Sequence, residues 1–334
     1  MFNTGGIQTM ERQGNLMQFR PDIKVLDATI RDGGLVNDFY FDDEFVKNLY
    51  NANVKAGIDY MEFGYKASKD IFDTEKFGKW KFCDEADLRS IVGDNDTDLK
   101  IAVMADVGRC DFKKDFMPKC DSVIDMVRVA TYINTMPAAI EMIEHFHALG
   151  YETTCNIMAV STAQENDIYM ALELLGESNV DVIYLVDSYG SLYPEQVHEL
   201  SFKYRKIADK YGKKIGIHAH NNQQLAFANT IEACSYGVSY LDGTMSGMGR
   251  GAGNCTLEML MGFLKNPKYK ILPVLKFVQN DIEKLKAEGV VWGYDVPYLC
   301  TGILNLHPRS AIAAMHDNDK DYSNFYIGLW DRDI

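Results

Sequence analysis

Two histidines at alternate positions, His218 and His220, stand at the end of a predicted strand over residues 214–220. Because side chains alternate along a strand, both point to the same side, roughly 7 Å apart at the backbone. Two ligands of one metal ion can share that spacing. An isolated strand histidine is more often a structural residue, but a pair followed by the polar residues Asn221 and Asn222 favours metal binding.

A second group of charged residues follows the first predicted strand, residues 23–30. Arg31 and Asp32 stand there, followed by Gly33 and Gly34. The two glycines predict a tight turn at which a ligand can approach the backbone closely. The alternative role for Asp32, pairing with a neighbouring lysine or arginine, stays open at this point.

A glycine-rich loop, residues 247–254, follows the last predicted strand and has the sequence GMGRGAGN. Its glycines free backbone N–H groups and permit close approach to a ligand. Too little βαβ pattern follows for a dinucleotide-binding unit, so NAD and FAD are disfavoured. We expect an active-site loop, with the last barrel helix beginning at Asn254. The Asn254 side chain either caps that helix or serves as an oxygen ligand.

Other strand ends also carry polar groups. Glu62 lies near the end of the second predicted strand, and Asp187 and Ser188 follow the sixth. For each of them, a place in the site and a place on the solvated surface are equally compatible with the pattern.

The elements that must position these residues form eight repeats of a short β-rich run and a segment of helical period, typical of βα units around a parallel sheet. The predicted strands span residues 23–30, 59–64, 100–105, 122–130, 152–160, 181–187, 214–220 and 238–244. The clearest helices each end at a glycine and span residues 42–57, 135–150, 162–176, 194–212 and 222–237. Eight repeats in about 245 residues predict an α/β fold, the (β/α)₈ TIM barrel, whose catalytic residues lie at the C-terminal strand ends.

The predicted barrel occupies only part of the chain. The alternation stops near residue 265, so we expect a catalytic barrel over residues 22–265 and a C-terminal helical extension over residues 266–334. Residues 1–21 are polar, and we expect a leader without regular structure. A doubly wound open sheet is the competing fold, and the length favours the barrel.

Composition narrows the classes of function. Of 334 residues, 47% are hydrophobic and 25% charged, as in ordinary globular proteins. The net charge of −14 and the lack of a basic block argue against a nucleic-acid partner. No apolar run reaches the roughly 18 residues of a membrane helix, and no signal peptide is evident, so we expect no membrane association and a cytoplasmic location. The seven cysteines lack a C-x-x-C pair and are expected to be reduced thiols.

Five segments carry motifs that occur together in one enzyme superfamily. They are LDATIRDGG (26–34), VRVATY (127–132), VDSYG (186–190), HAHNN (218–222) and GVSYLDGTMSGMGRGAGNCTLE (237–258). In this order they resemble the HMG-CoA-lyase-like (DRE-TIM) metallolyases, and the similarity spans residues 24 to about 262. Within that superfamily the chain is most similar to the 4-hydroxy-2-oxovalerate aldolases, which implies a TIM barrel and metal-dependent C–C bond chemistry.

The resemblance implies a metal site. Asp32, His218 and His220 match the superfamily's divalent-metal ligands, and Asn254 matches an asparagine that is a further ligand in the lyase branch. Two histidines and one carboxylate with open positions fit Mn²⁺, Mg²⁺, Co²⁺ or Zn²⁺, and we favour Mn²⁺ or Mg²⁺ for an oxygen-rich substrate.

It also implies residues that contact the substrate. Arg31 matches the arginine that binds and stabilises the enolate oxygen, which would make it a catalytic and a substrate-binding residue. Ser188 matches a substrate-contacting position. Residues 292–294, Trp-Gly-Tyr, match loosely a C-terminal region that contributes a tyrosine near the barrel mouth.

The chain departs from the aldolases at one position. They carry a histidine three residues after the metal-binding aspartate, as the base toward the substrate hydroxyl, and this chain has Leu35 there. Another base is therefore needed within about 3 Å of that hydroxyl, and the candidates are Tyr40, Tyr65, Tyr189 and His307. We expect slow or no cleavage of 4-hydroxy-2-oxovalerate and a more polar hydroxylated substrate.

The sequence thus predicts a divalent-metal-dependent aldolase that cleaves or forms a C–C bond through a pyruvate-type enolate, with a small 2-oxo acid and an aldehyde as substrates. We also expect a homo-oligomer, and the resemblance implies an acylating aldehyde dehydrogenase as a protein partner. Two other classes of function stay open. One is an acyl-CoA-dependent Claisen synthase or lyase of the isopropylmalate synthase or HMG-CoA lyase kind. The other is a non-catalytic binding subunit that keeps the metal.

Overall fold

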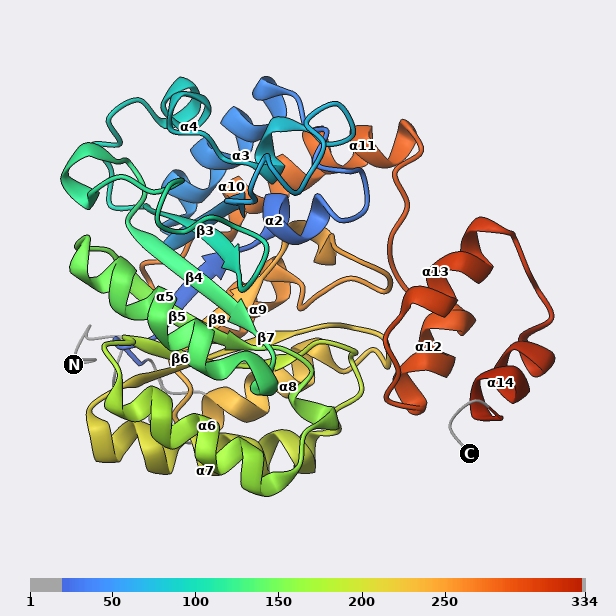
Figure 1. The fold of residues 1–334 in the computed structure, drawn as a ribbon. Helices are drawn as coiled ribbons and strands as arrows, with labels where there is room; N and C mark the ends of the chain where they lie inside the picture. Colours follow the sequence, from blue (N-terminus) through green and yellow to red (C-terminus); the bar gives the residue numbers. More distant parts are fainter. Residues whose placement is uncertain (1–19, 332–334) are drawn as a thin grey trace, which may run out of the picture.

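Eight parallel strands form a closed barrel in the computed structural model, which describes residues 20–331 (Figure 1). Each strand pairs with its neighbours in chain order, and β1 closes the ring by pairing with β8. The strands are β1 (Lys24–Asp27), β2 (Tyr60–Tyr65), β3 (Lys100–Asp106), β4 (Met126–Thr131), β5 (Glu152–Ile157), β6 (Val182–Asp187), β7 (Lys214–Ala219) and β8 (Tyr240–Gly243). The predicted TIM barrel is confirmed.

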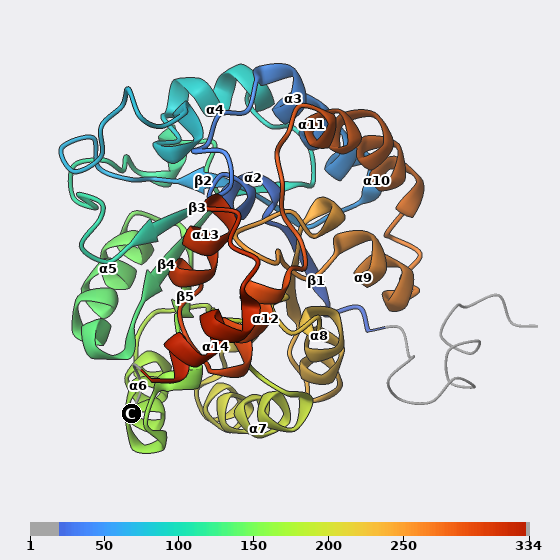
Figure 2. The ribbon, with the colours of Figure 1, turned by 90° about the vertical axis from the view of Figure 1, so that its right-hand side faces the viewer.

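A ring of helices covers the outside of the strands, so the strands are buried on both faces (Figure 2). Two helices follow β1, α2 (Thr29–Gly33) and α3 (Asp43–Ala56), and only a 3₁₀ turn lies between β3 and β4. One α-helix follows each of the remaining strands: α4 (Glu85–Val92), α5 (Met136–Ala148), α6 (Glu165–Glu177), α7 (Pro194–Tyr211), α8 (Ala226–Ser235) and α9 (Leu257–Leu264). Short 3₁₀ turns lie in the loops, at Lys79–Lys81, Lys119–Asp121, Ile133–Thr135, Val160–Thr162 and Met245–Gly247. Gly57 and Gly212 end α3 and α7 in the left-handed conformation, as their positions predict.

The first strand is shorter than predicted. β1 ends at Asp27, and Arg31 and Asp32 lie on the single helical turn α2 instead of directly at a strand end. The Asp27 carboxylate accepts the Thr29 N–H at 2.9 Å, which turns the chain out of the sheet. The Thr29 hydroxyl in turn accepts the Met245 N–H at 2.8 Å, so β8 and its loop support α2. Tertiary contacts therefore stabilise a turn that is too short to be stable alone.

The two glycines after Asp32 have a different role from the expected flexible turn. Gly33 belongs to α2, and Gly34 has the helical φ of −60°, so neither needs the left-handed region. Space is the constraint: a Cβ on Gly33 would lie 2.9 Å from the Met248 sulfur, and one on Gly34 would overlap the Phe39 ring. Glycine at both positions therefore permits close packing under the loop that carries Met248.

The chain after β8 and α9 is helical. It contains α10 (Ile271–Phe277), a π-helical turn (Val278–Ile282), α11 (Glu283–Ala287), α12 (Val296–Ile303), α13 (Arg309–His316) and α14 (Tyr322–Trp330). Helix α10 packs against α3, whereas α12, α13 and α14 lie across the end of the barrel (Figures 1 and 2).

Two polar contacts attach α12 and its end to the strand-end loops. Asn222 after β7 donates to the Tyr298 carbonyl at 3.5 Å, and Ser161 after β5 donates to Asn305 at 2.7 Å. The C-terminal helices therefore cover the end of the barrel at which the chemistry is expected. The division of the chain at residue 265 stays a prediction, and most of the predicted leader lies outside the described residues.

All seven cysteines are free thiols, and five of them are buried. Among the described residues, no helix combines the length and the hydropathy that a membrane span requires.

Candidate metal centre

Asp32, His218 and His220 converge at the C-terminal end of the barrel. One ligand atom from each residue can be chosen so that all three lie within 4.8 Å of one another. The side chains come from α2, from β7 and from the residue after β7, and all are at most 5% exposed. It is the one such buried His and carboxylate group found in the described part of the chain, and its spacing suits a single ion.

A carboxylate behind the site orients one of the histidines. Nδ1 of His218 lies 3.0 Å from Oδ2 of Asp242 on β8, so the ring donates its proton there and keeps a lone pair on Nε2. Metal-binding histidines commonly have such a carboxylate partner, which sets the tautomer and the ring orientation. The pair therefore prepares Nε2 of His218 to act as a ligand atom.

The protonation states of the site also suit a cation. Burial lowers the pKa of His220 to about 3, so this imidazole is neutral and has a lone pair to offer. Burial alone would raise the pKa of the Asp32 carboxyl, but the His220 ring and the Arg31 guanidinium hold it well below its usual range. Near pH 7 the site thus presents the Asp32 carboxylate and the neutral His220 imidazole to a cation.

Asn254 does not cap the helix that follows it. Helix α9 begins at Leu257, and Thr256 occupies its N-cap position. The Asn254 amide nitrogen instead donates to Oδ2 of Asp32 and to the Met248 carbonyl, the latter at 3.1 Å. Its Oδ1 is buried without a hydrogen-bond partner, which is costly unless a ligand is bound there. An unpaired amide oxygen beside Asp32 is a suitable fourth donor for a divalent ion.

The glycine loop presses directly against these ligands. A Cβ on Gly249 would overlap both the Asn254 amide nitrogen and the Asp32 carboxylate. Close approach to the ligands, not nucleotide binding, therefore explains this glycine.

We expect Gly249→Ala to weaken binding of Mn²⁺ by at least roughly tenfold, because the new methyl group must displace Asp32 or Asn254. The matched control is Gly262→Ala on α9, where no atom lies within 4 Å of the new Cβ and alanine favours the helix. Titration of both variants with Mn²⁺ measures the difference. Equal affinities in the two variants would show that the loop does not position the ligands.

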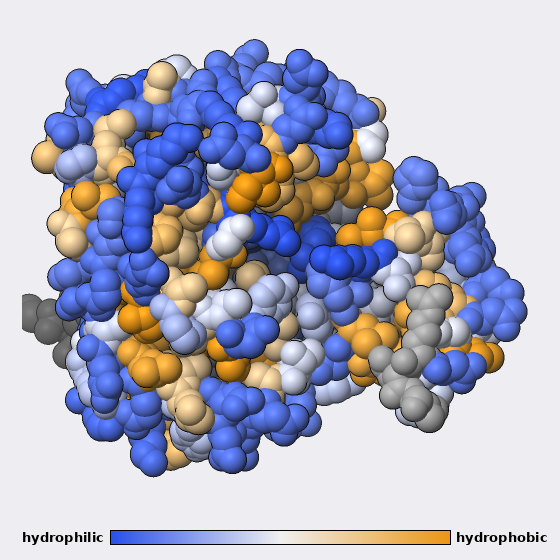
Figure 3. Space-filling model, in the orientation of Figure 1, coloured by the Kyte–Doolittle hydropathy of each residue, from blue (hydrophilic) through white to orange (hydrophobic). Residues whose placement is uncertain are grey.

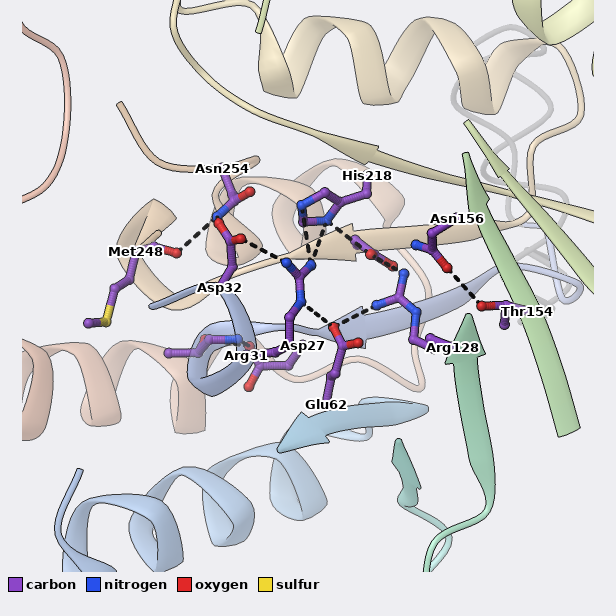
Figure 4. A network of polar contacts seen from close by, with 12 residues as sticks. Asp27, Arg31, Asp32, Glu62, Arg128, Thr154, Asn156, His218, Met248 and Asn254 are labelled. Atoms are coloured by element: carbon purple, nitrogen blue, oxygen red, sulfur yellow. Dashed lines mark hydrogen bonds and ion pairs between the residues drawn. The ribbon is translucent and has the colours of Figure 1, made fainter. Parts of the chain in front are cut away.

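Arg31 lies beside the triad and is held on two sides. Its Nη1 donates to Oδ1 of Asp32 at 2.7 Å, and its Nε donates to Oε2 of Glu62 at 2.8 Å (Figure 4). Its Nη2 lies 3.3 Å from Nε2 of His218. These contacts leave about two of the five guanidinium N–H donors for a substrate.

The ion pairs continue across the barrel interior. Arg128 on β4 donates to Glu62 at 2.7 Å and to Asp242 at 2.6 Å, so Asp32, Arg31, Glu62, Arg128 and Asp242 form one chain of alternating charge. Three carboxylates face two guanidinium groups, which leaves one net negative charge for a cation to balance. The buried network fixes the position of Arg31 and His218 before any ligand binds.

Sequence inspection missed the roles of Arg128 and Asp242. Both lie inside runs of apolar strand residues, and a charged residue in the middle of a buried strand needs a partner. That signal was available, but it does not identify the partners. The sequence pattern was equally compatible with Glu62 on the surface and Glu62 in the site. In the structure Glu62 is fully buried within β2 and joins this network.

The polar residues after β6 support the chain. Asp187 accepts the Ser191 N–H at 2.9 Å, and burial raises the pKa of its carboxyl to about 7. The Ser188 hydroxyl accepts the Ala159 N–H at 2.9 Å, while its carbonyl accepts a hydrogen bond from Arg250 at 3.1 Å. Ser188 is thus near the mouth, and its hydroxyl is engaged by the backbone.

The four candidate bases lie in three different places. Tyr40 is 57% exposed and donates to the Glu75 carbonyl, away from the triad. Tyr65 ends β2 near Arg31, but burial and nearby carboxylates raise its pKa above the usual value, which makes it a poor base. Tyr189 and His307 lie together, with ring centroids 5.6 Å apart, and burial and two arginines lower the pKa of His307 to about 4.

Residues 292–294 reach the glycine loop through Trp292 and Gly293, not through the tyrosine that the resemblance implies. Trp292 donates to the Ser246 carbonyl at 3.1 Å, and the Gly293 N–H donates to the Gly251 carbonyl. Tyr294 is 52% exposed. The rings that pack against the loop are those of Trp292, beside Gly253, and Tyr298 on α12, beside Gly251.

A family model described as HMGL-like matches residues 22–283 of the chain. A 4-hydroxy-2-oxovalerate aldolase of Pelotomaculum thermopropionicum is 28% identical over 254 residues, which cover 75% of this chain and 72% of the relative. An oxaloacetate decarboxylase of Mycobacterium tuberculosis is 28% identical over 245 residues, or 72% of this chain and 69% of the relative.

Solved structures have the same fold. The N-terminal domain of a candidate aldolase from Bacteroides vulgatus superposes with a TM-score of 0.74 at 26% identity, covering 88% of this chain and 96% of that one. An HMG-CoA lyase of Bacillus subtilis gives a TM-score of 0.64 at 16% identity, over 80% and 95% of the two chains. The second likeness concerns the fold alone.

Proposed function

Because the chain belongs to the HMGL-like family, in which metal-dependent C–C lyases occur, we propose that it cleaves or forms a C–C bond of a 2-oxo acid through a pyruvate-type enolate. The observation that carries the proposal is the buried Asp32, His218 and His220 group with Arg31 held beside it. In the cleavage direction, the C3–C4 bond of a 4-hydroxy-2-oxo acid breaks, the hydroxyl proton passes to a base, and C3 is protonated. The products are pyruvate and an aldehyde.

Four side chains would hold the ion: Asp32, His218, His220 and the Asn254 amide oxygen. We favour Mn²⁺ or Mg²⁺, and Co²⁺ or Zn²⁺ suit the same donors. When bound, the ion supplies Lewis-acid polarisation of the 2-oxo acid carbonyl.

Arg31 would bind the oxygen on which negative charge develops. Its remaining N–H donors are held in place by Glu62 and Asp32, so little reorganisation is needed as the charge forms. Arg31 is only 4% exposed, and burial strengthens such a charge interaction relative to the same interaction in water. Arg31 is therefore the residue of this chain to which we assign stabilisation of the enolate.

Because Leu35 stands where the aldolases have their basic histidine, a second candidate reaction is the decarboxylation of oxaloacetate. Leu35 lies just after α2, where its N–H donates to the Asp32 carbonyl at 3.1 Å, and its hydrocarbon side chain has no atom that can accept a proton. Decarboxylation releases CO₂ from C4, leaves the electron pair on the same enolate and needs no base for a hydroxyl group. The similarity to an oxaloacetate decarboxylase supports testing this reaction.

We expect metal-loaded wild type to release pyruvate from oxaloacetate faster than from 4-hydroxy-2-oxovalerate. Leu35→His should raise turnover of the hydroxy acid by roughly tenfold or more, since a positioned general base contributes about 10²–10⁴-fold. It should leave decarboxylation little changed. The four rates, those of wild type and Leu35→His on each of the two substrates, are measured as pyruvate release. The same concentration of metal without protein serves as the blank.

Robust wild-type turnover of 4-hydroxy-2-oxovalerate that Leu35→His does not improve would show that another group already serves as the base. Consumption of an acyl-CoA in place of pyruvate release would favour the Claisen class. Retained metal and ligand binding without any turnover would identify a binding subunit. The homo-oligomer and the aldehyde dehydrogenase partner stay predictions.

A further inference from the structure

Two arginines near the candidate metal centre, Arg250 and Arg309, have no carboxylate partner among the described residues. The arginines that do form such pairs are Arg20, Arg31, Arg89, Arg128 and Arg205. Arg109 also lacks such a partner, but Arg109 and Arg309 are exposed to solvent, so the half-buried Arg250 is the group whose unpaired donors need an explanation.

The C-terminal helices bring these groups together. The contact of Ser161 with Asn305 anchors the segment between α12 and α13, and the His307 ring then lies against Tyr189 after β6. The positive charges of Arg250 and Arg309 both act on His307 and Tyr189, so the four side chains share one neighbourhood. Segments more than 100 residues apart thus meet at the barrel mouth (Figure 2).

These side chains offer hydrogen-bond donors. Arg250 uses Nη2 on the Ser188 carbonyl at 3.1 Å, and its Nε is buried without a partner. Nδ1 of His307 accepts the Arg309 N–H at 3.2 Å, which leaves the ring proton of the neutral imidazole on Nε2. The ring therefore presents a donor, and so does each guanidinium group.

The cluster adjoins the metal ligands. Arg250 directly follows Gly249, where an added Cβ would overlap Asp32 and Asn254, and its guanidinium reaches the Ser188 carbonyl after β6. The cluster therefore lies on the loop that packs against the triad. Figure 3 shows a hollow with hydrophilic residues between the barrel and the C-terminal helices.

We propose that Arg250, His307 and Arg309 form a subsite for a second anionic group, a carboxylate or a phosphate, on the aldehyde half of the substrate. This inference rests on the proposed function and specifies its substrate class, a 4-hydroxy-2-oxo acid with a second acidic group. A bound anion would balance the positive charge around His307 and accept hydrogen bonds from the buried Nε of Arg250 and from the His307 ring.

The test compares two unreactive 2-oxo acids of equal length, 2-oxoglutarate and 2-oxopentanoate, which differ by a carboxylate in place of a methyl group. We expect the Mn²⁺-loaded protein to bind 2-oxoglutarate at least roughly tenfold more tightly by calorimetry, as one charge-assisted contact provides. Arg250→Gln and Arg309→Gln should each reduce that ratio several-fold. The control is Arg205→Gln on the outer helix α7, which should leave the ratio unchanged.

Equal binding of the two acids by wild type, or a ratio that neither mutation lowers, would overturn the subsite. Arg309 is exposed, so its variant is expected to fold normally and keeps the test decisive even if Arg250→Gln does not fold. Competition of inorganic phosphate with 2-oxoglutarate would assign the anion as a phosphate, and its failure to compete would assign it as a carboxylate. Because no turnover is required, a preference for the dianion in an inactive protein supports the subsite while rejecting the proposed reaction.

Discussion

Arg31→Ala should lower kcat by roughly a hundredfold or more, the effect of removing a preorganised partner of an oxyanion. The guanidinium group lies between Asp32 and Glu62 with donors to spare, so its loss removes charge stabilisation that strengthens as the enolate forms. The direct measurement is exchange of pyruvate methyl protons into deuterated water by the Mn²⁺-loaded protein. This assay isolates enolate formation from the unknown aldehyde.

A structural effect of the substitution can be separated from a catalytic one. Glu62 keeps its ion pair with Arg128 at 2.7 Å when Arg31 is removed, so the barrel interior remains largely paired. Arg31→Lys retains the charge without the planar set of donors and should give an intermediate exchange rate. Arg89→Ala on α4 controls for loss of an arginine elsewhere. Exchange at the wild-type rate in Arg31→Ala would refute the role assigned to this residue.

Asp32→Asn and His220→Ala are expected to abolish stoichiometric metal binding and to reduce turnover to the background rate. Asp32→Asn removes the negative charge of the one carboxylate in the buried set, whereas His220→Ala removes a donor and leaves a cavity beside Asp32. Elemental analysis after chelation, reloading with Mn²⁺ and removal of excess ion measures the content directly. Full metal content in both variants would show that the ion binds elsewhere or not at all.

Two further variants are expected to show a partial loss of metal binding and no loss, respectively. Asp242→Asn keeps all four donors but weakens the orientation of His218, so we expect metal affinity to fall by roughly ten- to a hundredfold, as for other residues behind metal ligands. His198→Ala on α7, where the histidine is 41% exposed and next to Glu232, should bind metal normally. This series distinguishes loss of a ligand from loss of folding.

Local features determined much of the fold. Alternating β-rich and helical runs predict a parallel sheet covered by helices on both faces, and the length of eight such repeats favours the closed barrel over an open sheet. The glycines after α3 and α7 predict their ends, because glycine adopts the left-handed conformation at little cost. The alternation of side chains along a strand places His218 and His220 on one side, which is a local property of extended backbone.

Only the tertiary structure decided how Asp32 and Arg31 are presented. The helical turn α2 depends on the Asp27 carboxylate and on the Met245 N–H, which is more than 200 residues away in the chain. The sequence alone predicts a continued strand there, because apolar and β-branched residues follow Asp27. A five-residue helix has too few internal hydrogen bonds to form without such contacts.

The position of the C-terminal segment also depended on tertiary contacts. Nothing periodic in the chain after α9 indicates that His307 and Arg309 return to the barrel mouth beside Tyr189 and Arg250. The partners of Arg128 are likewise set by the register and closure of β2, β4 and β8. Sequence pattern reports the local period and the burial of an element, whereas the pairing of charges across a barrel depends on distances that only the closed fold establishes.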